Sequence, residues 1–541
     1  MRLVPFRLYA LAFFSALLQL LPFPLAGPVP VWRRLFCWFC LVPLLQALLG
    51  RDTHAQVLGP WRSALLGYVC GVAWFGGNCY WIYQTMFIYG GLPSPVAFGI
   101  LILFSLYLGL YFALFGACFG WVRRWKGAGA ALVTAPFLWV AVELARARVT
   151  GFPWDLLGYT QVDNNFLTPL APFTGVMGLS LVVALVNVLW FWRPWFATRS
   201  WLGPALAGLL MILSYLGCVH KSPVLEPTAS AILVQDNLSV GAEARGPQET
   251  QSELLANLSE VTRHAVSSPA LSTIVSKDAD EIRTNLLAPQ LVVWPEAPTM
   301  FTSADPRFRG SMAKLAQAEH APVVVDAVGF GTQPNETGHY DEFASASFFL
   351  PDGTYAGRYD KMHLVPFGEY TPYKQLFFFA GHLLDQLVFV PGSQRDLFSV
   401  NGHRFGVFIC YESIFGDEVR EFAKNGAGVL VNLSDDGWYG DTSAPWEHLD
   451  MARMRAIENR RWLLRDTNTG TTASIDPNGR LVARLPRHIR GAIQVPFGFR
   501  HDVTFYTRFG DWLGWVCALL SVSVLAGSYL QQRYPVTAQQ S

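Results

Sequence analysis

The sequence predicts a multi-pass α-helical membrane protein of about eight spans with one inserted α/β domain. Hydrophobic residues make up 52% of the 541 residues and charged residues only 15%, whereas soluble domains carry about 25% charged residues. The long apolar runs lie towards both ends of the chain, while residues 228–497 alternate short apolar runs with polar turns. The net charge of +1 gives no reason to expect nucleic-acid binding.

The apolar runs set the expected domain boundaries, because a helix needs about 20 apolar residues to cross the hydrocarbon core. We expect spans near residues 8–26, 35–50, 63–83, 95–121, 129–146, 168–192, 202–219 and 510–530. The first run resembles a secretory signal, but no small-residue cleavage site follows it, so we expect a retained anchor. The expected domains are therefore a seven-helix membrane domain at 1–222, a polar domain at 228–497 and an eighth transmembrane helix at 508–532.

Basic residues between the spans favour an orientation with the N-terminus inside the cell. Arg123, Arg124 and Lys126 then lie on the inner side, and the outer loop 84–94 contains no basic residue. The arginines at 33, 34, 146 and 148 favour the opposite orientation. With the N-terminus inside, the polar region 220–505 lies outside the cytoplasm.

The polar region has the pattern of a layered α/β domain. Short apolar runs recur between turn signals, among them "AILVQDN", "QLVVWPEAP", "APVVVDAVGF", "RFGVFICYE" and "GVLVNLSDD". Helical patterns, such as residues 448–462, lie between some of these runs. Strands that alternate with helices predict layered sheets covered by helices. The segment 239–290 is weakly patterned, and we expect a surface excursion with a helix near 247–267.

Three residues at the ends of apolar runs could carry chemistry. Glu296 lies between two prolines in "VVWPEAP", Lys361 follows "GRYD", and Cys410 ends "GVFIC". Taken singly, each has an ordinary explanation as a solvated glutamate, a surface lysine or an inert buried cysteine. Cys410 is, however, the one cysteine of eight outside the expected spans, which excludes a disulfide within the polar domain.

Together, the three side chains have complementary chemistry. A thiol needs a base to become a thiolate, and acyl transfer needs a cation or N–H donors for the tetrahedral oxyanion. A carboxylate, an ammonium and a thiol supply these parts. We therefore expect Glu296, Lys361 and Cys410 to meet in one site.

The three strand ends resemble the Glu–Lys–Cys triad of the nitrilase, or carbon–nitrogen hydrolase, superfamily. The whole chain resembles the apolipoprotein N-acyltransferases, membrane-embedded members of that superfamily. The resemblance is carried by "FGGNCYWIY" at 75–83, "GFPWDLLGY" at 151–159, "VVWPEAP" at 292–298, "KMHLVPFGEY" at 361–370, "CYES" at 410–413, "NLSDDGWYG" at 432–440 and "RAIENRR" at 455–461. It implies that the polar domain is a nitrilase-like αββα sandwich.

The resemblance also implies a ping-pong reaction. Cys410 would take an acyl chain from a membrane phospholipid as a thioester and pass it to the N-terminal amine of a diacylglyceryl-apolipoprotein. Glu296 would be the general base, and Lys361 with the backbone N–H of Tyr411 would stabilise the oxyanion. No metal or cofactor is implied, and the enzyme would act as a monomer.

Further residues and the cellular location follow from the same resemblance. Glu369 would support the triad, and Tyr411, Glu412 and Trp438 would line the site. The chain would lie in the bacterial inner membrane with its catalytic domain on the periplasmic side. This sequence departs from the family in having Asp236 where glycine is usual, and it lacks the entrance tryptophan that usually follows.

Two other functions remain as alternatives. A membrane-tethered nitrilase-type amidase would hydrolyse a small amide with water as the acceptor, and a non-enzymatic scaffold or transporter would carry an inactive nitrilase domain. Motifs within the spans disfavour the tethered amidase, and the intact triad disfavours the scaffold. We also expect the apolar segment 373–392, with Phe377, Phe378 and Phe379, to form a lid or membrane-dipping arm.

Overall fold

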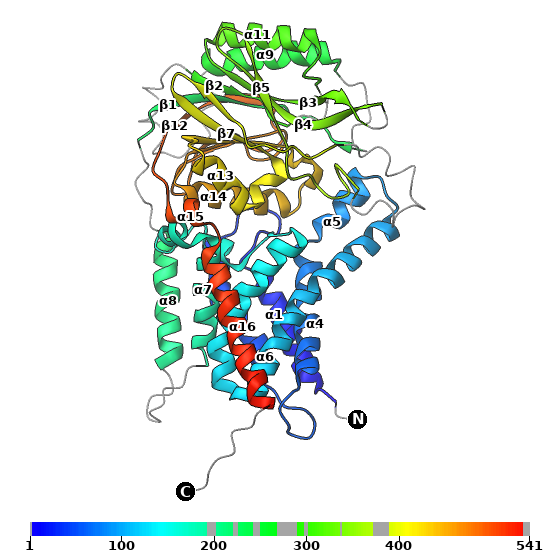
Figure 1. The fold of residues 1–541 in the computed structure, drawn as a ribbon, viewed down its shortest axis with the longest axis vertical. Coiled ribbons are helices and arrows are strands. Elements are labelled where there is room, and N and C mark those ends of the chain that lie inside the picture. Colours follow the sequence, from blue (N-terminus) through cyan, green and yellow to red (C-terminus); the bar gives the residue numbers. More distant parts are fainter. Residues whose placement is uncertain are drawn as a thin grey trace. The chain divides into compact units, whose positions relative to one another are not determined.

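The computed structural model describes residues 3–191, 202–219, 226–241, 249–267, 289–296, 301–335, 338–371 and 389–533. The chain divides into two compact units (Figure 1). The membrane unit consists of Met1–Ser222, Asp441–Met454 and Phe509–Ser541, and the sandwich unit consists of Pro223–Gly440 and Arg455–Arg508. The expected lid at 373–392 falls mostly outside the described residues, as does much of the segment 239–290.

Helices make up the membrane unit. They are α1 (Phe6–Leu20), α2 (Val31–Arg34), α3 (Val42–Leu48), α4 (Pro60–Asn78), α5 (Trp81–Gln84), α6 (Ser94–Ala145), α7 (Ala171–Leu189), α8 (Leu202–Val219) and α16 (Trp512–Arg533). Within the described ranges, four stretches are long and apolar enough to cross a membrane, namely Val31–Leu48, Ser94–Thr150, Thr168–Leu189 and Trp512–Arg533. The membrane character of this unit is therefore supported, while the count of eight spans stays a prediction.

The longest helix accounts for two of the expected spans. The expected spans 95–121 and 129–146 are the two halves of α6, which are separated by a break in the backbone at Gly127 (φ 89°, ψ 172°). Essentially only glycine adopts this conformation, because it has no Cβ. Leu103 on α6 and Leu519 on α16 are each 67% exposed, which is expected of helices whose outer faces meet lipid.

The first two expected spans differ from the structure. The helix expected at 8–26 ends at Leu20, because Pro22 and Pro24 cannot continue an α-helix. The span expected at 35–50 is not one regular helix. It starts earlier, at α2, and passes through the 3₁₀ turn Leu35–Trp38 before α3 begins.

Two six-stranded sheets form the sandwich unit. In spatial order, the first sheet contains β12 (Gly491–Phe497), β1 (Ala229–Gln235), β2 (Pro289–Val293), β3 (Val323–Pro334), β4 (Tyr340–Phe349) and β5 (Tyr355–Asp360). The second contains β11 (Leu481–Arg484), β10 (Ala473–Ile475), β9 (Leu463–Thr467), β8 (Val429–Ser434), β7 (His403–Ile409) and β6 (Leu397–Val400). Parallel pairing joins β1 to β2 and β2 to β3 in the first sheet, and β7 to β8 and β8 to β9 in the second.

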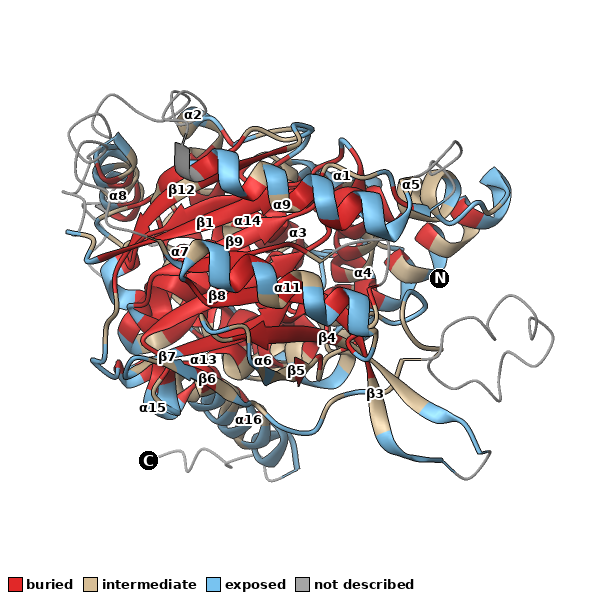
Figure 2. Cartoon of the chain, turned by 90° about the horizontal axis from the view of Figure 1, so that it is seen from above, coloured by how far each residue is buried: buried red, intermediate tan, exposed pale blue. Residues whose placement is uncertain are grey.

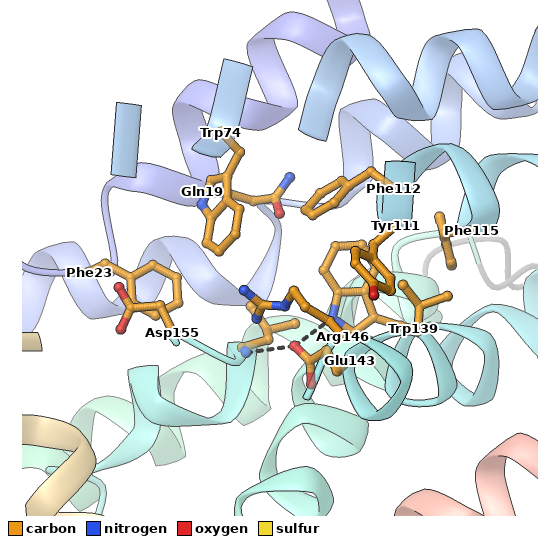
Figure 3. Close-up of a pocket in the computed structure, with 12 residues that line it drawn as sticks. Gln19, Phe23, Trp74, Tyr111, Phe112, Phe115, Trp139, Glu143, Arg146 and Asp155 are labelled. Carbon is orange, nitrogen blue, oxygen red and sulfur yellow. Dashed lines mark hydrogen bonds between the residues drawn. The ribbon is translucent and has the colours of Figure 1, made fainter. Parts of the chain in front are cut away.

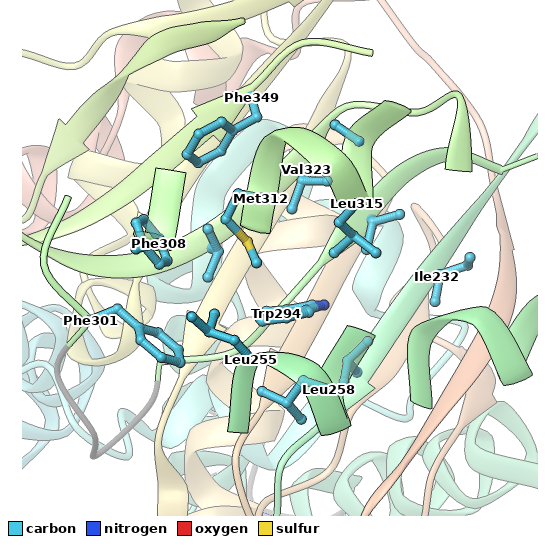
Figure 4. Close-up of a cluster of buried hydrophobic side chains, with 14 of the residues drawn as sticks. Ile232, Leu255, Leu258, Trp294, Phe301, Phe308, Met312, Leu315, Val323 and Phe349 are labelled. Carbon is cyan, nitrogen blue, oxygen red and sulfur yellow. The ribbon is translucent and has the colours of Figure 1, made fainter. Parts of the chain in front are cut away.

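Helices cover the outer faces of the sheets. On the first sheet, α9 (Gln251–Ser267) and α11 (Pro306–Glu319) bury a cluster that includes Leu258, Trp294 and Met312, each at most 1% exposed (Figure 4). Figure 2 shows each of these helices with one face exposed and the other buried over the strands. The second sheet carries α13 (Gly416–Lys424). The inner faces meet where Phe348 of β4 stacks on Phe398 of β6, with ring centroids 4.5 Å apart.

The sandwich unit thus confirms the predicted layered α/β fold. Its helix α9 lies within the expected range 247–267. The helix expected at 448–462 is α14 (Ala444–Asn459), which begins four residues earlier and is shared between the two units. A short helix, α15 (Phe505–Phe509), precedes α16.

Candidate active site

The three expected site residues each follow the end of a strand in the sandwich unit. Glu296 lies three residues after β2, Lys361 directly after β5, and Cys410 directly after β7. Glu296 and Lys361 therefore come from the first sheet and Cys410 from the second. The last residues of β2 and most of β7 are buried, whereas β5 is mostly half-buried. All three are paired within a sheet, which supports side chains that must be held accurately.

Lys361 is placed between two carboxylates. Its side chain is fully buried, and its Nζ lies 2.5 Å from Oε1 of Glu369 and 3.4 Å from Oε1 of Glu296. Burial lowers the pKa of the Lys361 ammonium, but Glu296 and Glu369 outweigh burial and raise that pKa well above its usual value. The lysine therefore stays charged at neutral pH.

The two carboxylates are themselves held by backbone groups. Oε2 of Glu296 accepts the N–H of Asp435 at 2.9 Å, and Oε2 of Glu369 accepts the N–H of Val365 at 2.8 Å. Each carboxylate thus has one oxygen towards the lysine and the other on the backbone. This arrangement restricts the rotation of both side chains and leaves Lys361 in a defined position.

Cys410 is at a sharp turn between β7 and the 3₁₀ helix Cys410–Ile414. Its φ is +47°, a conformation that non-glycine residues adopt rarely and that often occurs at active sites. Burial and the neighbouring Glu296 raise the pKa of the Cys410 thiol well above its usual value, and Lys361 acts in the opposite direction. The thiol is neutral at rest and needs a base to become nucleophilic.

Glu412 connects the segment after Lys361 with the strand that carries Cys410. Its carboxylate is 2% exposed. Four donors reach it, namely Ile409 N at 2.7 Å, Tyr359 Oη at 2.7 Å, Met362 N at 2.8 Å and His363 N at 3.2 Å. Ile409 immediately precedes the cysteine, and Met362 immediately follows the lysine, so one carboxylate fixes both segments.

The remaining expected residues differ in exposure. Tyr411 is buried, with its ring edge on Phe415 at 5.2 Å, whereas Trp438 is 42% exposed on the 3₁₀ helix Asp436–Tyr439. The buried residue on that helix is Tyr439, whose pKa is raised by burial and by Cys410. The structure thus brings together Glu296, Lys361, Glu369, Cys410 and Glu412, with Tyr411 next in the chain to Cys410.

The sequence did not single out three residues that contribute to this site. Asp435 holds Glu296, Tyr439 lies in the surroundings of the thiol, and Tyr359 donates to Glu412. Asp435 and Tyr439 lie within the motif "NLSDDGWYG", which indicated that this segment is part of the site but did not indicate these two positions. No sequence pattern pointed to Tyr359, because its contact with Glu412 depends on where the pairing of β5 places it. Among the described residues, no group of three or more His, Cys, Asp or Glu side chains is placed to hold a metal ion.

Comparisons with known proteins cover both halves of the chain. The family description "Apolipoprotein N-acyltransferase N-terminal domain" matches residues 5–189, and "Carbon-nitrogen hydrolase" matches residues 247–497. The second match identifies the sandwich unit as nitrilase-like. Among solved structures, an amidase from Nesterenkonia sp. is 18% identical, with a TM-score of 0.34 over 52% of this chain and 95% of that chain.

Relatives of similar length carry one name. A protein from Geobacter metallireducens named "Apolipoprotein N-acyltransferase" is 32% identical over 97% of this chain and 95% of its own length. A protein of the same name from Methylococcus capsulatus is 32% identical over 88% of this chain and 89% of its own length. These matches confirm the resemblance predicted from the motifs, and the chain belongs to the apolipoprotein N-acyltransferase family.

Proposed function

We propose that this protein transfers an acyl group from a membrane phospholipid to the N-terminal amine of a diacylglyceryl-apolipoprotein through a thioester on Cys410. The observation that carries the proposal is the cluster of Glu296, Lys361 and Cys410 in a chain of this family. The carboxylate, the ammonium and the thiol are the three groups that acyl transfer through a thiol requires.

In the first half-reaction, Glu296 accepts the proton of the Cys410 thiol. The thiolate attacks the ester carbonyl carbon of the phospholipid, and the oxyanion that forms is stabilised by the ammonium of Lys361 and the backbone N–H of Tyr411. The tetrahedral intermediate then breaks the C–O bond of the ester. The leaving lysophospholipid oxygen takes the proton from Glu296, and the acyl chain remains on Cys410 as a thioester.

In the second half-reaction, the amine of the apolipoprotein attacks the thioester carbonyl carbon. Glu296 accepts the proton that the amine loses as the C–N bond forms. The C–S bond then breaks, and the departing thiolate of Cys410 takes the proton back from Glu296. The product is an amide, and the enzyme returns to its starting state without a metal or a cofactor.

The membrane unit suits substrates that stay in a bilayer. Each buried CH₂ group contributes about 0.8 kcal/mol, so neither a diacyl donor nor a diacylglyceryl acceptor leaves the lipid readily. We place the protein in the bacterial inner membrane as a monomer with eight spans and with the sandwich unit on the periplasmic side. The apolar helices Ser94–Thr150, Thr168–Leu189 and Trp512–Arg533 support membrane insertion.

The thioester can be tested by intact mass after incubation of the purified protein with a diacyl phospholipid. We expect a mass gain of one acyl group that neutral hydroxylamine removes and that Cys410→Ala abolishes. Cys118→Ala is the matched control, because Cys118 is partly exposed and lies in the membrane unit. Folded wild-type protein without an adduct would contradict the ping-pong mechanism.

The acceptor separates acyl transfer from the amidase alternative. When a diacylglyceryl-cysteine peptide is added to the acylated protein, we expect the adduct to disappear and the peptide to gain one acyl chain. Release of free fatty acid without acylation of the peptide would instead indicate water as the acceptor.

A further inference from the structure

Asn468 is a buried asparagine whose hydrogen bonds join three segments of the sandwich unit. It directly follows β9 and is 0% exposed. Its side-chain Oδ1 accepts the N–H of Leu238 at 2.7 Å, and its Nδ2 donates to the carbonyl oxygen of Leu238 at 2.9 Å. The same Nδ2 donates to Oδ1 of Asp435 at 3.1 Å. The backbone N–H of Asn468 donates to Ser434, and its carbonyl oxygen accepts the N–H of Asn237, both at 3.0 Å.

These hydrogen bonds connect the two sheets at the ends of their strands. Leu238 follows β1, which is the neighbour of β2 in the first sheet, whereas Asp435 follows β8 and Asn468 follows β9 in the second. An asparagine amide offers an acceptor oxygen and two N–H donors in one plane. These groups let one side chain exchange two bonds with the backbone of Leu238 and still reach Asp435.

Such full engagement is not general among the buried polar side chains of this protein. In the hollow of the membrane unit drawn in Figure 3, Oε2 of Glu143 and Nη1 of Arg146 are buried, and the described residues give neither atom a hydrogen-bond partner. The amide oxygen and nitrogen of Asn468, in contrast, are both engaged. Because a buried polar group is costly to leave unpaired, these contacts fix the orientation of the amide.

Asp435 carries this orientation to the candidate base. Its Oδ1 accepts the N–H of Gly437 at 2.9 Å in addition to Nδ2 of Asn468, so its carboxyl group is held on two sides. Its backbone N–H donates to Oε2 of Glu296 at 2.9 Å. Burial and Glu296 raise the pKa of the Cys410 thiol, whereas the backbone N–H of Asp435 lowers it. One backbone group therefore influences both the carboxylate and the thiol.

A general base is effective only when it is held within hydrogen-bonding reach of the proton that it accepts. One oxygen of Glu296 faces Lys361, and the other depends on the direction of the Asp435 N–H. We propose that Asn468 is a positioning residue that, through Asp435, holds Glu296 for the deprotonation of Cys410. The proposal rests on the proposed role of Glu296 as the base. Asn468 acts through hydrogen bonds and exchanges no proton itself.

Alkylation of Cys410 by iodoacetamide tests the proposal without an acyl donor or acceptor. The rate is measured on the full-length protein by intact mass at several pH values, with Cys410→Ala protein as the blank, because the thiolate is the species that reacts. We expect Asn468→Ala to react about tenfold more slowly than wild-type protein at pH 7, since the base is held less accurately. The two rates should approach each other at alkaline pH, where hydroxide removes the proton. A fold that was merely loosened would instead expose the thiol and raise the rate at every pH.

Two further variants make the comparison specific. Asn459→Ala removes another fully buried amide of the sandwich unit, one that bonds to Arg455 and Thr507. We expect it to lower the melting temperature and to leave the pH profile of alkylation unchanged. Asp435→Leu removes the contact with Asn468 from the other side, so we expect slow alkylation at pH 7 as in Asn468→Ala. It also provides the test if Asn468→Ala fails to fold.

Three results would overturn the proposal. The first is equal alkylation of wild-type protein and Asn468→Ala at every pH while Glu296→Gln reacts slowly, which would leave Glu296 as the base and remove Asn468 from its support. The second is equally slow alkylation of Asn459→Ala, because loss of any buried amide would then be sufficient. The third is a wild-type rate in Glu296→Gln, which would also remove the first step of the proposed acyl transfer.

Discussion

Lys361 shows how a buried charge is kept at the candidate active site. Burial by itself would lower the pKa of a lysine in this position, since it disfavours the ammonium. Glu296 and Glu369 reverse that tendency, and backbone N–H groups hold both carboxylates in place. The ammonium therefore stays charged between the two carboxylates, and Glu296 is close enough to influence the pKa of the Cys410 thiol as well.

The hydroxyl of Tyr359 is predicted to be a positioning group. Tyr359→Phe removes one of the four donors to Glu412, so we expect kcat about threefold to tenfold lower with little change in KM. Kinetic measurement on the purified enzyme checks this expectation. Tyr355→Phe is the matched control on the same strand, because the contacts described for Tyr355 are ring contacts with Arg309 and Phe349. Equal kinetics for both variants would contradict the role of Tyr359.

Asp435 is predicted to make the stability of the folded protein depend on pH. Burial and the neighbouring Glu296 raise the pKa of Asp435 well above its usual value. The folded state therefore binds this proton more tightly than the unfolded state does. The resulting stability is fully present below the unfolded pKa and is lost as the pH rises through the folded pKa.

Asp435→Asn should remove this part of the pH dependence. We expect its melting temperature to fall less than that of wild-type protein as the pH is raised from acid to alkaline values. Asp352→Asn is the control. The N–H of Thr354 lowers the pKa of the exposed Asp352, so the titration of this carboxyl changes the stability only at acid pH. Parallel melting curves against pH for wild type and Asp435→Asn would refute the prediction.

At the scale of elements, the strand register decides which side chains meet. The parallel pairing of β7 with β8 places Ile409 opposite Leu433, so Cys410 and Asp435 both follow the same end of neighbouring strands. Asp435 in turn donates to Glu296, which follows β2 of the other sheet. The site is therefore built where strand ends from both sheets come together.

The break in α6 gives a prediction for the membrane unit. Gly127→Ala places a Cβ in a conformation that costs about 1–3 kcal/mol, so we expect a lower melting temperature in detergent. Gly129→Ala is the matched control, since both positions have open space around a Cβ and only Gly127 has a positive φ. We expect Gly129→Ala to leave the melting temperature unchanged or slightly higher. Equal losses would mean that the φ of Gly127 is not the cause.

For the whole molecule, the chain combines a unit with exposed apolar helices and a unit with a buried β-sandwich. Neither the sheets nor the helices by themselves supply both a thiol site and a way to hold lipid substrates. The match of two family descriptions to the two halves agrees with this division.

The proposed orientation predicts which surface residues react outside the cytoplasm. Thr332 in β3 and His54 in the segment after α3 are both exposed. We expect Thr332→Cys to react with a membrane-impermeant maleimide in cells with a permeabilised outer membrane, and His54→Cys to react only after lysis. The native cysteines give little background, because all eight are buried or partly buried. Labelling of both positions before lysis would reject the orientation.

The sequence by itself determined the class of each unit and singled out the candidate site residues that the structure brings together. Long apolar runs and short alternating runs are local patterns, and Glu296, Lys361 and Cys410 are marked by the strands before them. Only the tertiary structure decided which groups pair. Tyr359 and Glu412 lie 53 residues apart in sequence, and Glu296 and Asp435 lie 139 residues apart. Local patterns reflect neighbours along one helix or strand, whereas hydrogen bonds between elements follow from how those elements pack.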